Sequence, residues 1–222
     1  MRGIAIVPAI LTTELPEASE LLGEVAELSP RVQLDVMDGR LVPEESFLLS
    51  DFGSIPDGLK IELHAMVADP RALLTDCERL GIRRLVFHLE SFGSLAEAAA
   101  FASELIDRGF IPVATCWPTA ELTALPDVRY YQLMGVHPGA AGQRLLGDTA
   151  QRVARLRTEL PPEASIQVDG GVNRSTIVDL ARAGARRFIV NTAFWQADDQ
   201  LTALYELKSL AEGGANGVSA RN

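Results

Sequence analysis

The 222-residue chain has few cysteines, no excess of basic residues and no long apolar run. Its two cysteines, Cys77 and Cys116, predict neither a disulfide framework nor a thiolate metal site. Acidic residues outnumber basic ones by 30 to 20, whereas a nucleic-acid-binding protein needs a basic face. No apolar run approaches the roughly 20 residues that cross a bilayer, and the first residues lack the layout of a signal peptide. We therefore expect a cytoplasmic protein with no nucleic-acid or membrane partner.

What the chain does have is an alternation of short β-branched runs with longer amphipathic segments. The expected strands are residues 4–10, 32–37, 59–66, 84–88, 111–116, 130–134, 165–168 and 187–190. The expected helices are residues 17–28, 70–80, 95–108, 149–160, 174–183 and 201–211. The segments 44–52 and 119–125 look shorter and poorly formed.

Eight strands at this spacing predict an α/β protein, a single-domain (β/α)8 TIM barrel over residues 1–212. A doubly wound open sheet is the alternative, but it usually carries a glycine-rich turn after its first strand. Here that strand ends in Pro8-Ala9-Ile10-Leu11-Thr12, without glycine. Residues 213–222 are small and polar, which predicts a flexible C-terminal tail.

Two of the expected strands end by presenting an aspartate, Asp35 in Gln-Leu-Asp-Val-Met-Asp-Gly and Asp169 in Gln-Val-Asp-Gly-Gly. An unpaired charge is costly in a buried strand, so two such residues indicate a site built on a carboxylate pair. The alternative is that each aspartate only caps a loop or pairs with an arginine. The histidines also fall at or just past strand ends, where a barrel places its active face: His64, His88 and His137.

Apolar and small residues complete the expected site. Three methionines at strand ends, Met37, Met66 and Met134, would give it soft apolar walls, unless they are ordinary core. The loops 137–143 and 169–173 have the composition of phosphate-binding turns, although each alone is compatible with an ordinary turn.

Taken together, these motifs resemble the ribulose-phosphate 3-epimerases nearly from end to end. The matching stretches are Pro8-Ala9-Ile10-Leu11, Leu34-Asp35-Val36-Met37-Asp38-Gly39, Val42-Pro43, His64-Ala65-Met66-Val67, Phe87-His88-Leu89-Glu90, Pro138-Gly139 with Gly142-Gln143, and Val168-Asp169-Gly170-Gly171-Val172. The resemblance implies an isomerase of carbohydrate metabolism in the pentose phosphate class, which interconverts D-ribulose 5-phosphate and D-xylulose 5-phosphate. It also implies a sugar-phosphate substrate and a homo-oligomer.

The resemblance further implies the role of each site residue. Asp35 and Asp169 would be the opposed acid/base groups. A divalent metal (zinc, iron, manganese or cobalt) would stabilise an enediolate as a Lewis acid. The implied metal ligands are His64, Asp35 and Asp169, with Gln33 as a weak fourth. The implied substrate-binding residues are Met37, Met66, Met134, Gly139, Gly142, Gly170, Gly171, Asn191 and Thr192.

Five positions depart from the family's pattern. They are Gln33 for a metal histidine, Ala9 for a serine, Glu44 for an asparagine, Gly139-Ala140-Ala141-Gly142 for Gly-Phe-Gly-Gly, and Asn191-Thr192 for Gly-Ser. Three hypotheses follow: an epimerase whose metal site is compensated, with His137 as one source of the missing nitrogen; a barrel paralogue acting on another sugar or sugar phosphate; and a non-catalytic relative. A hexulose-phosphate synthase is less favoured, because the first strand lacks the Asp and Lys of such enzymes.

Overall fold

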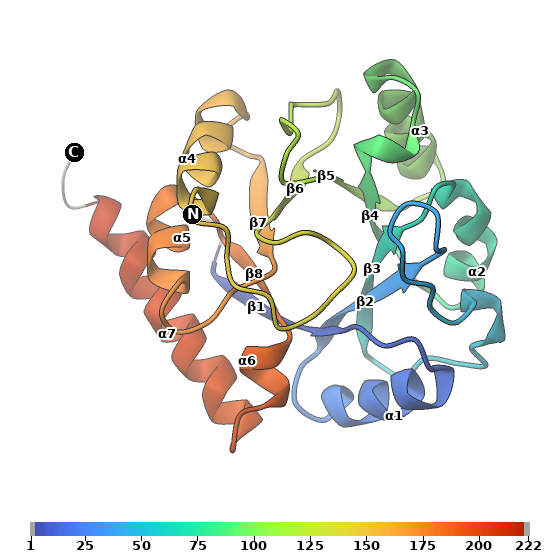
Figure 1. Cartoon of the computed structure of the whole chain (residues 1–222), viewed down its shortest axis with the longest axis horizontal. Helices are drawn as coiled ribbons and strands as arrows, with labels where there is room; N and C mark the ends of the chain where they lie inside the picture. Colours follow the sequence, from blue (N-terminus) through green and yellow to red (C-terminus); the bar gives the residue numbers. More distant parts are fainter. Residues whose placement is uncertain (1–2, 220–222) are drawn as a thin grey trace.

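Eight parallel strands close into a barrel in the order β1 to β8, in a computed structural model that describes residues 3–219 (Figure 1). The strands are β1 Ala5–Ile10, β2 Arg31–Met37, β3 Lys60–Met66, β4 Arg84–His88, β5 Ile111–Cys116, β6 Tyr130–Met134, β7 Ser165–Asp169 and β8 Arg187–Val190. The barrel predicted from the sequence is confirmed. Four strands match their expected bounds, and each of the others differs by one residue at one end.

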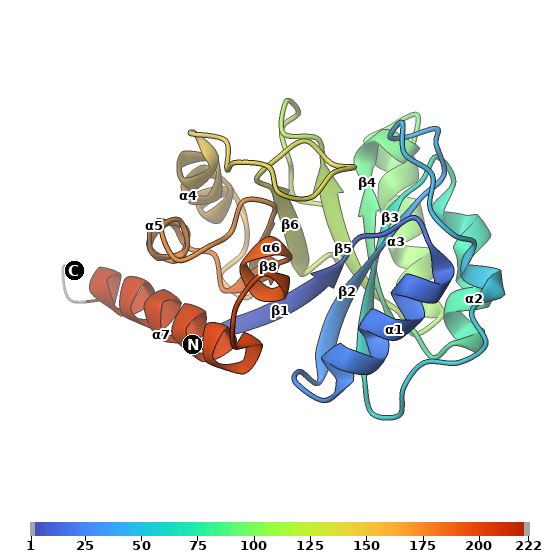
Figure 2. The same ribbon diagram turned by 60° about the horizontal axis from the view of Figure 1, so that its bottom comes forward.

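Helices surround the barrel, as Figures 1 and 2 show. They are α1 Leu15–Ala26, α2 Leu74–Arg79, α3 Leu95–Asp107, α4 Thr149–Glu159, α5 Ile177–Ala183, α6 Thr192–Trp195 and α7 Gln200–Ser219, with short 3-10 turns η1 Leu49–Asp51, η2 Pro70–Leu73 and η3 Leu89–Ser91. The connections after β2 and β5 are irregular, as expected: the first contains η1, and residues 117–129 form no helix. None of the helices in residues 3–219 is both long enough and apolar enough to span a bilayer.

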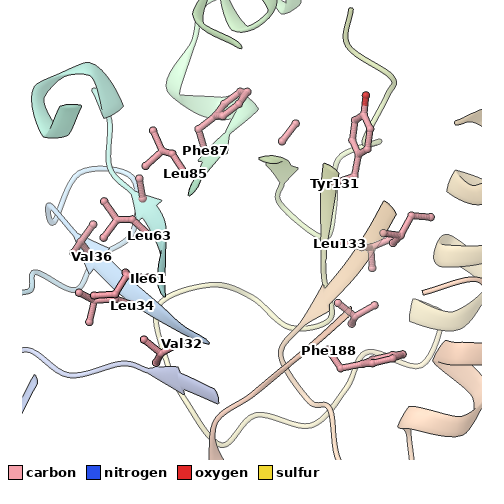
Figure 3. Close-up of a cluster of buried hydrophobic side chains, with 14 of the residues drawn as sticks. Val32, Leu34, Val36, Ile61, Leu63, Leu85, Phe87, Tyr131, Leu133 and Phe188 are labelled. Carbon is pink, nitrogen blue, oxygen red and sulfur yellow. The ribbon is translucent and has the colours of Figure 1, made fainter. Parts of the chain in front are cut away.

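The apolar core lies between the strands and these helices (Figure 3). Leu34, Leu63 and Phe188 belong to this core and are fully buried. Because side chains alternate along a strand, the neighbouring residues point into the barrel, and several of these are polar. Gln33, Gln132 and Gln167 are among them, each no more than 2% exposed. The inside of this barrel therefore holds a buried polar network, whereas its outside is apolar.

Helix α7 corrects the expected C-terminal boundary. The flexible tail predicted from residue 213 is wrong for residues 213–219, which continue the helix. Gly214 is buried against α5, and a Cβ on it would lie 2.6 Å from the Val178 carbonyl oxygen. The small residues thus allow two helices to approach closely, and α5 and α7 lie side by side (Figure 1). Residues 220–222 lie outside the described part of the chain.

Candidate active site

A cavity of about 330 Å³ opens at the carboxyl ends of the strands. Asp35 from β2, His64 from β3 and Asp169 from β7 line it, together with the loop of residues 135–148 between β6 and α4. This β6–α4 loop, yellow in Figures 1 and 2, lies across the end of the barrel. The volume lies within the usual range for small-molecule sites.

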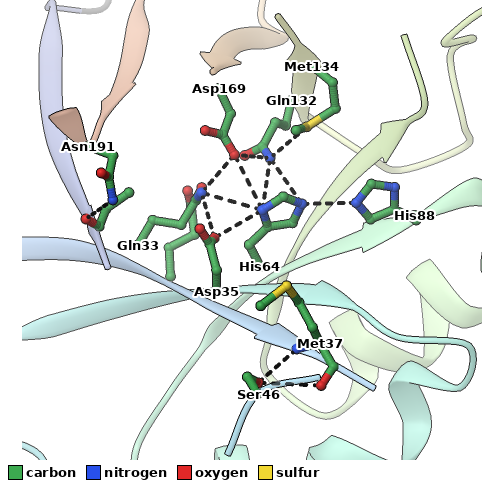
Figure 4. A network of polar contacts seen from close by, with 12 residues as sticks. Gln33, Asp35, Met37, Ser46, His64, His88, Gln132, Met134, Asp169 and Asn191 are labelled. Atoms are coloured by element: carbon green, nitrogen blue, oxygen red, sulfur yellow. Dashed lines mark hydrogen bonds and ion pairs between the residues drawn. The ribbon is translucent and has the colours of Figure 1, made fainter. Parts of the chain in front are cut away.

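One imidazole holds the two carboxylates together (Figure 4). His64 Nδ1 lies 3.1 Å from Asp35 Oδ1 and 3.3 Å from Asp169 Oδ2. Asp35 and His64 are direct neighbours in the register of β2 and β3, and Asp169 reaches the same ring from β7. The barrel therefore brings together the three residues that the strand-end pattern predicted.

The charges of this cluster shift its protonation equilibria. Burial opposes a charge on His64, but hydrogen bonds and charge interactions with Asp169 and Asp35 outweigh it and raise its pKa to about 10. Burial also raises the pKa of Asp35, although contact with His64 partly offsets this effect. The ring is therefore a cation at neutral pH, and Asp35 is more basic than an exposed aspartate.

Two amide groups complete the cluster. Gln33 Nε2 donates to Asp35 Oδ1 at 3.1 Å and to Asp169 Oδ2 at 2.9 Å, while its Oε1 is buried with no hydrogen-bond partner among the described residues. Gln132 Nε2 also donates to Asp169 Oδ2, at 2.9 Å. Sequence reasoning missed Gln132, although a polar residue inside the apolar strand Tyr130–Met134 is the same signal that identified the aspartates.

Gln132 also connects the site to the opposite end of the barrel. Its Oε1 accepts a hydrogen bond from Gln167 Nε2 at 2.6 Å, and the same Nε2 donates to Glu62 Oε1 at 2.7 Å. Arg84 Nη2 donates to Gln167 Oε1 at 3.1 Å. A continuous polar column, made of Asp169, Gln132, Gln167 and Glu62, therefore runs through the barrel.

His88 backs the central imidazole. The two rings lie edge to edge with their planes 13° apart and their centroids 5.1 Å apart, and the Nε2 atoms of His64 and His88 are 2.9 Å apart. Burial lowers the pKa of His88 to about 4, although Glu90, whose Oε2 lies 3.6 Å from His88 Nδ1, partly opposes it. A neutral His88 accepts the Nε2 proton of His64 and so fixes the ring that both aspartates contact.

Not all of the predicted substrate-binding residues line the cavity. Met66 and Met134 line the cavity, but Met37 packs with Met66, Val42 and Leu11 and is not among its lining residues. Gly139, Gly142, Gly170, Gly171, Asn191 and Thr192 all line it. The Asn191 side chain is directed toward β1, because its Nδ2 donates to the Ala9 carbonyl at 3.1 Å.

Glycine is required where the loops after β6 and β7 meet. Gly171 has a φ of +69°, and a Cβ on it would lie 2.6 Å from the backbone of Leu145. Gly139, with φ of +112°, leaves room for the Glu44 carboxylate, which a Cβ there would overlap. The loop after β2 thus contacts the β6–α4 loop across the cavity opening, and Glu44 places an acid there.

His137 does not join the central cluster. It is exposed on the cavity rim, whereas the described side chains grouped closely enough to share a metal are Asp35, His64 and Asp169, with ligand atoms within 4.8 Å of one another. The structure therefore gives no support to His137 as the missing nitrogen. Arg144, which sequence reasoning also missed, is the one Lys or Arg among the described lining residues.

Comparisons with known proteins agree with the motifs. The sequence model of the ribulose-phosphate 3 epimerase family matches residues 5–195. Ribulose-phosphate 3-epimerase of Chlamydia trachomatis serovar D is 28% identical over 89% of this chain and 88% of the relative. The protein of the same name from Aquifex aeolicus is 27% identical over 79% and 82%, and that from Mycobacterium tuberculosis is 26% identical over 94% and 93%.

Solved structures with low sequence identity share the fold. Thiamine phosphate pyrophosphorylase from Pyrococcus furiosus has a TM-score of 0.60 at 14% identity, covering 95% of this chain and 96% of that chain. Orotidine 5'-phosphate decarboxylase from Pyrococcus horikoshii has a TM-score of 0.58 at 14% identity, covering 94% and 99%. At these identities the likeness shows a common barrel and nothing of the reaction.

Proposed function

The chain belongs to the ribulose-phosphate 3 epimerase family, and we propose that it inverts C3 of a ketose phosphate, interconverting D-ribulose 5-phosphate and D-xylulose 5-phosphate. The observation that carries this proposal is the pair of aspartates, from β2 and β7, that share one buried imidazole inside a cavity. Relatives named ribulose-phosphate 3-epimerase, an isomerase, support it over most of the chain's length.

Inversion at C3 needs a base on one face of the substrate and an acid on the other. Asp35 and Asp169 supply the two groups, and they exchange roles when the reaction runs in reverse. The raised pKa of Asp35 brings a carboxylate closer to the basicity that proton abstraction requires. Gln33 and Gln132 hold the Asp169 carboxylate by donating hydrogen bonds to it, so that it has a fixed direction.

The central cluster also fits a divalent metal. One imidazole nitrogen and two carboxylate oxygens lie within 4.8 Å of one another, a donor set that suits zinc, iron, manganese or cobalt. When bound, such an ion supplies Lewis-acid stabilisation of the enediolate. His64 has to lose its Nδ1 proton to become a ligand, so metal and proton compete for it. Gln33 would take part only through Oε1, the buried acceptor that has no partner within residues 3–219.

The other half of the cavity suits the phosphate. It is lined by the small-residue turns at 139–142 and 170–171 and by Arg144, which follows the first turn by two residues. Positive charge is scarce in this acidic chain, and Glu44 beside Gly139 adds a negative one. We therefore assign Arg144 as the cation that offsets Glu44 and pairs with the substrate phosphate.

Proton exchange tests this function. The purified protein is incubated with D-ribulose 5-phosphate in D2O, with and without added Zn²⁺, Fe²⁺, Mn²⁺ or Co²⁺, and the C3 proton is followed by NMR. We expect metal-dependent loss of that signal and formation of D-xylulose 5-phosphate. A protein that is folded by circular dichroism but exchanges no C3 proton with any of the metals would overturn the proposal, leaving a paralogue with another substrate or a non-catalytic relative.

A further inference from the structure

A second cavity, of about 760 Å³, lies at the opposite end of the barrel, where the strands begin. Six of the chain's 20 Lys and Arg residues line it: Arg31, Lys60, Arg83, Arg84, Arg186 and Arg187. Among the described lining residues Glu62 is the only acid. A protein with a net charge of −10 thus concentrates positive charge in one recess, and we name it the cationic cavity.

The inner wall of the cationic cavity has more positive charge than its acid can neutralise. Glu62 is 2% exposed and pairs with two guanidinium groups, accepting a hydrogen bond from Arg84 Nε and lying 3.5 Å from Arg187 Nη2. Burial disfavours the Glu62 carboxylate, but the charges of Arg187 and Arg84 outweigh it and lower its pKa. Arg187 Nε is buried with no hydrogen-bond partner among the described residues, so one donor of this pair lacks an acceptor.

The rim of the cationic cavity adds two like charges on adjacent strands. Arg31 and Lys60 are direct neighbours in the register of β2 and β3, and both are exposed. Adjacent strands lie about 4.8 Å apart, so the two cations repel one another unless an anion lies between them. Burial lowers the pKa of Arg187 and outweighs the charge of Glu62, which raises it, and the charges of Arg84 and Arg31 lower it further.

We propose that the cationic cavity is a binding site for a small phosphate-bearing anion, separate from the active site. Guanidinium groups bind phosphate through paired N–H donors, and several converge here. The volume suits a metabolite, and Ile61, Ile111 and Tyr130 give the recess an apolar side for an organic group. A recess of this size admits a small ion more readily than the surface of a macromolecule.

Calorimetric titration with sodium tripolyphosphate tests this site. We expect saturable binding to the full-length wild-type protein, weakened at least ~10-fold in the double variant Arg31→Gln/Lys60→Gln, since hydrogen bonds between charged groups and phosphate are about twice as strong as neutral ones. The matched control, Arg155→Gln/Arg182→Gln, removes two exposed charges elsewhere and should change the affinity less than ~2-fold. Arg144→Gln, in the other cavity, should also leave it unchanged.

Three results would overturn the proposal: no binding by the wild-type protein at millimolar tripolyphosphate, equal weakening in both double variants, or loss of binding in Arg144→Gln. The last would place the anion in the active site instead. Arg84 and Arg187 are left intact because they pair with buried Glu62. If the double variant does not fold by circular dichroism, the single variants Arg31→Gln and Lys60→Gln serve the same comparison, each expected to weaken binding at least ~3-fold.

Discussion

The two ends of the barrel repeat one arrangement with opposite charge. At the carboxyl end, two carboxylates, Asp35 and Asp169, share one cationic imidazole. At the amino end, two guanidinium groups, Arg84 and Arg187, share one carboxylate, that of Glu62. In each case a single partner neutralises only one of two like charges. The carboxyl end is therefore suited to a cation, and the amino end to an anion.

The two ends differ in how completely their hydrogen bonds are made. Amide N–H groups from Gln33 and Gln132 donate hydrogen bonds to the carboxylates at the carboxyl end. At the amino end, Arg187 Nε has no acceptor among the described residues. The loop between β6 and α4 also lies over the carboxyl end (Figure 2). At the carboxyl end, hydrogen bonds from neighbouring amides fix the orientation of the two carboxylates, as a reaction site requires. At the amino end, the guanidinium groups are less completely hydrogen-bonded, which is sufficient for binding an ion.

The largest expected effect is the loss of catalysis on removing either negative charge at the carboxyl end. Asp35→Asn and Asp169→Asn should each reduce C3 exchange by about 10³-fold or more, because an amide neither accepts nor returns the proton. The measurement is the D2O exchange assay, with circular dichroism as the folding control. Near wild-type exchange in either folded variant would contradict the two-carboxylate mechanism.

At the amino end, removing the single shared partner should have its main effect on stability. Glu62→Gln leaves two largely buried guanidinium groups without their counter-charge, which should lower the free energy of unfolding by about 3 kcal/mol, the lower end of the range for buried ion pairs. Urea denaturation measures this change. The control Glu24→Gln, on the exposed side of α1, should stay within about 0.5 kcal/mol of wild type. Equal stability of the two variants would mean that the pairing at Glu62 is unimportant.

The two ends should also respond to opposite pH limits. The His64 pKa of about 10 lies above its usual 6.5. The protonated ring therefore contributes fully to the stability of the folded protein below pH ~6.5, and this contribution is lost as pH rises through ~10. The Glu62 pKa lies below its usual 4.5, so its contribution is present above pH ~4.5 and is lost as the solution becomes more acidic.

Urea denaturation of metal-free protein in EDTA at pH 6.5 and pH 10 checks the His64 half of this expectation. The free energy of unfolding should fall more between these values in wild type than in His64→Gln, which lacks the titrating ring. The same fall in both proteins would show that other groups dominate alkaline sensitivity and that His64 does not hold the two carboxylates as a cation.

The smallest expected effect is an increase in the affinity of the carboxyl end for a metal cation. Gln33→His replaces an amide that donates to both carboxylates by an imidazole that can bind metal, and should tighten metal binding by about 10-fold or more. Titration with Zn²⁺ against a competing chelator measures the change. An unchanged dissociation constant would show that residue 33 is not beside the metal.

Much of this arrangement was predictable from the sequence, for a simple reason. Asp35, His64 and Asp169 each stand near the end of an apolar strand, and all parallel strands of a barrel end on one face. That rule locates residues at strand ends without any knowledge of the barrel's closure. Gln132 and Glu62 lie within strands, where their partners depend on the stagger of strands that are distant in sequence. No local pattern carries that information.

The other differences between the expected and the observed placement of residues also arise from tertiary packing. The glycine-containing segment after residue 212 has the composition of a tail. It is helical instead, and the missing side chain of Gly214 allows α5 to pack closely against it. Met37 stands at a strand end like Met66, but it is packed beside the cavity instead of lining it. Asn191 lines the cavity, but its amide is engaged by the Ala9 carbonyl.

The polar column gives the active site a dependence on a distant residue. Arginine can only donate and an ionised carboxylate can only accept, so Arg84 and Glu62 together determine which end of the Gln167 amide is oxygen. That choice sets the orientation of Gln132 and directs its N–H group, not its oxygen, at Asp169. Without the carboxylate at position 62, the orientation of Gln167 depends on Arg84 alone, and that of Gln132 has weaker support from the column. The acid/base group would then be held less firmly by its amide donor, although no residue lining the active site had changed.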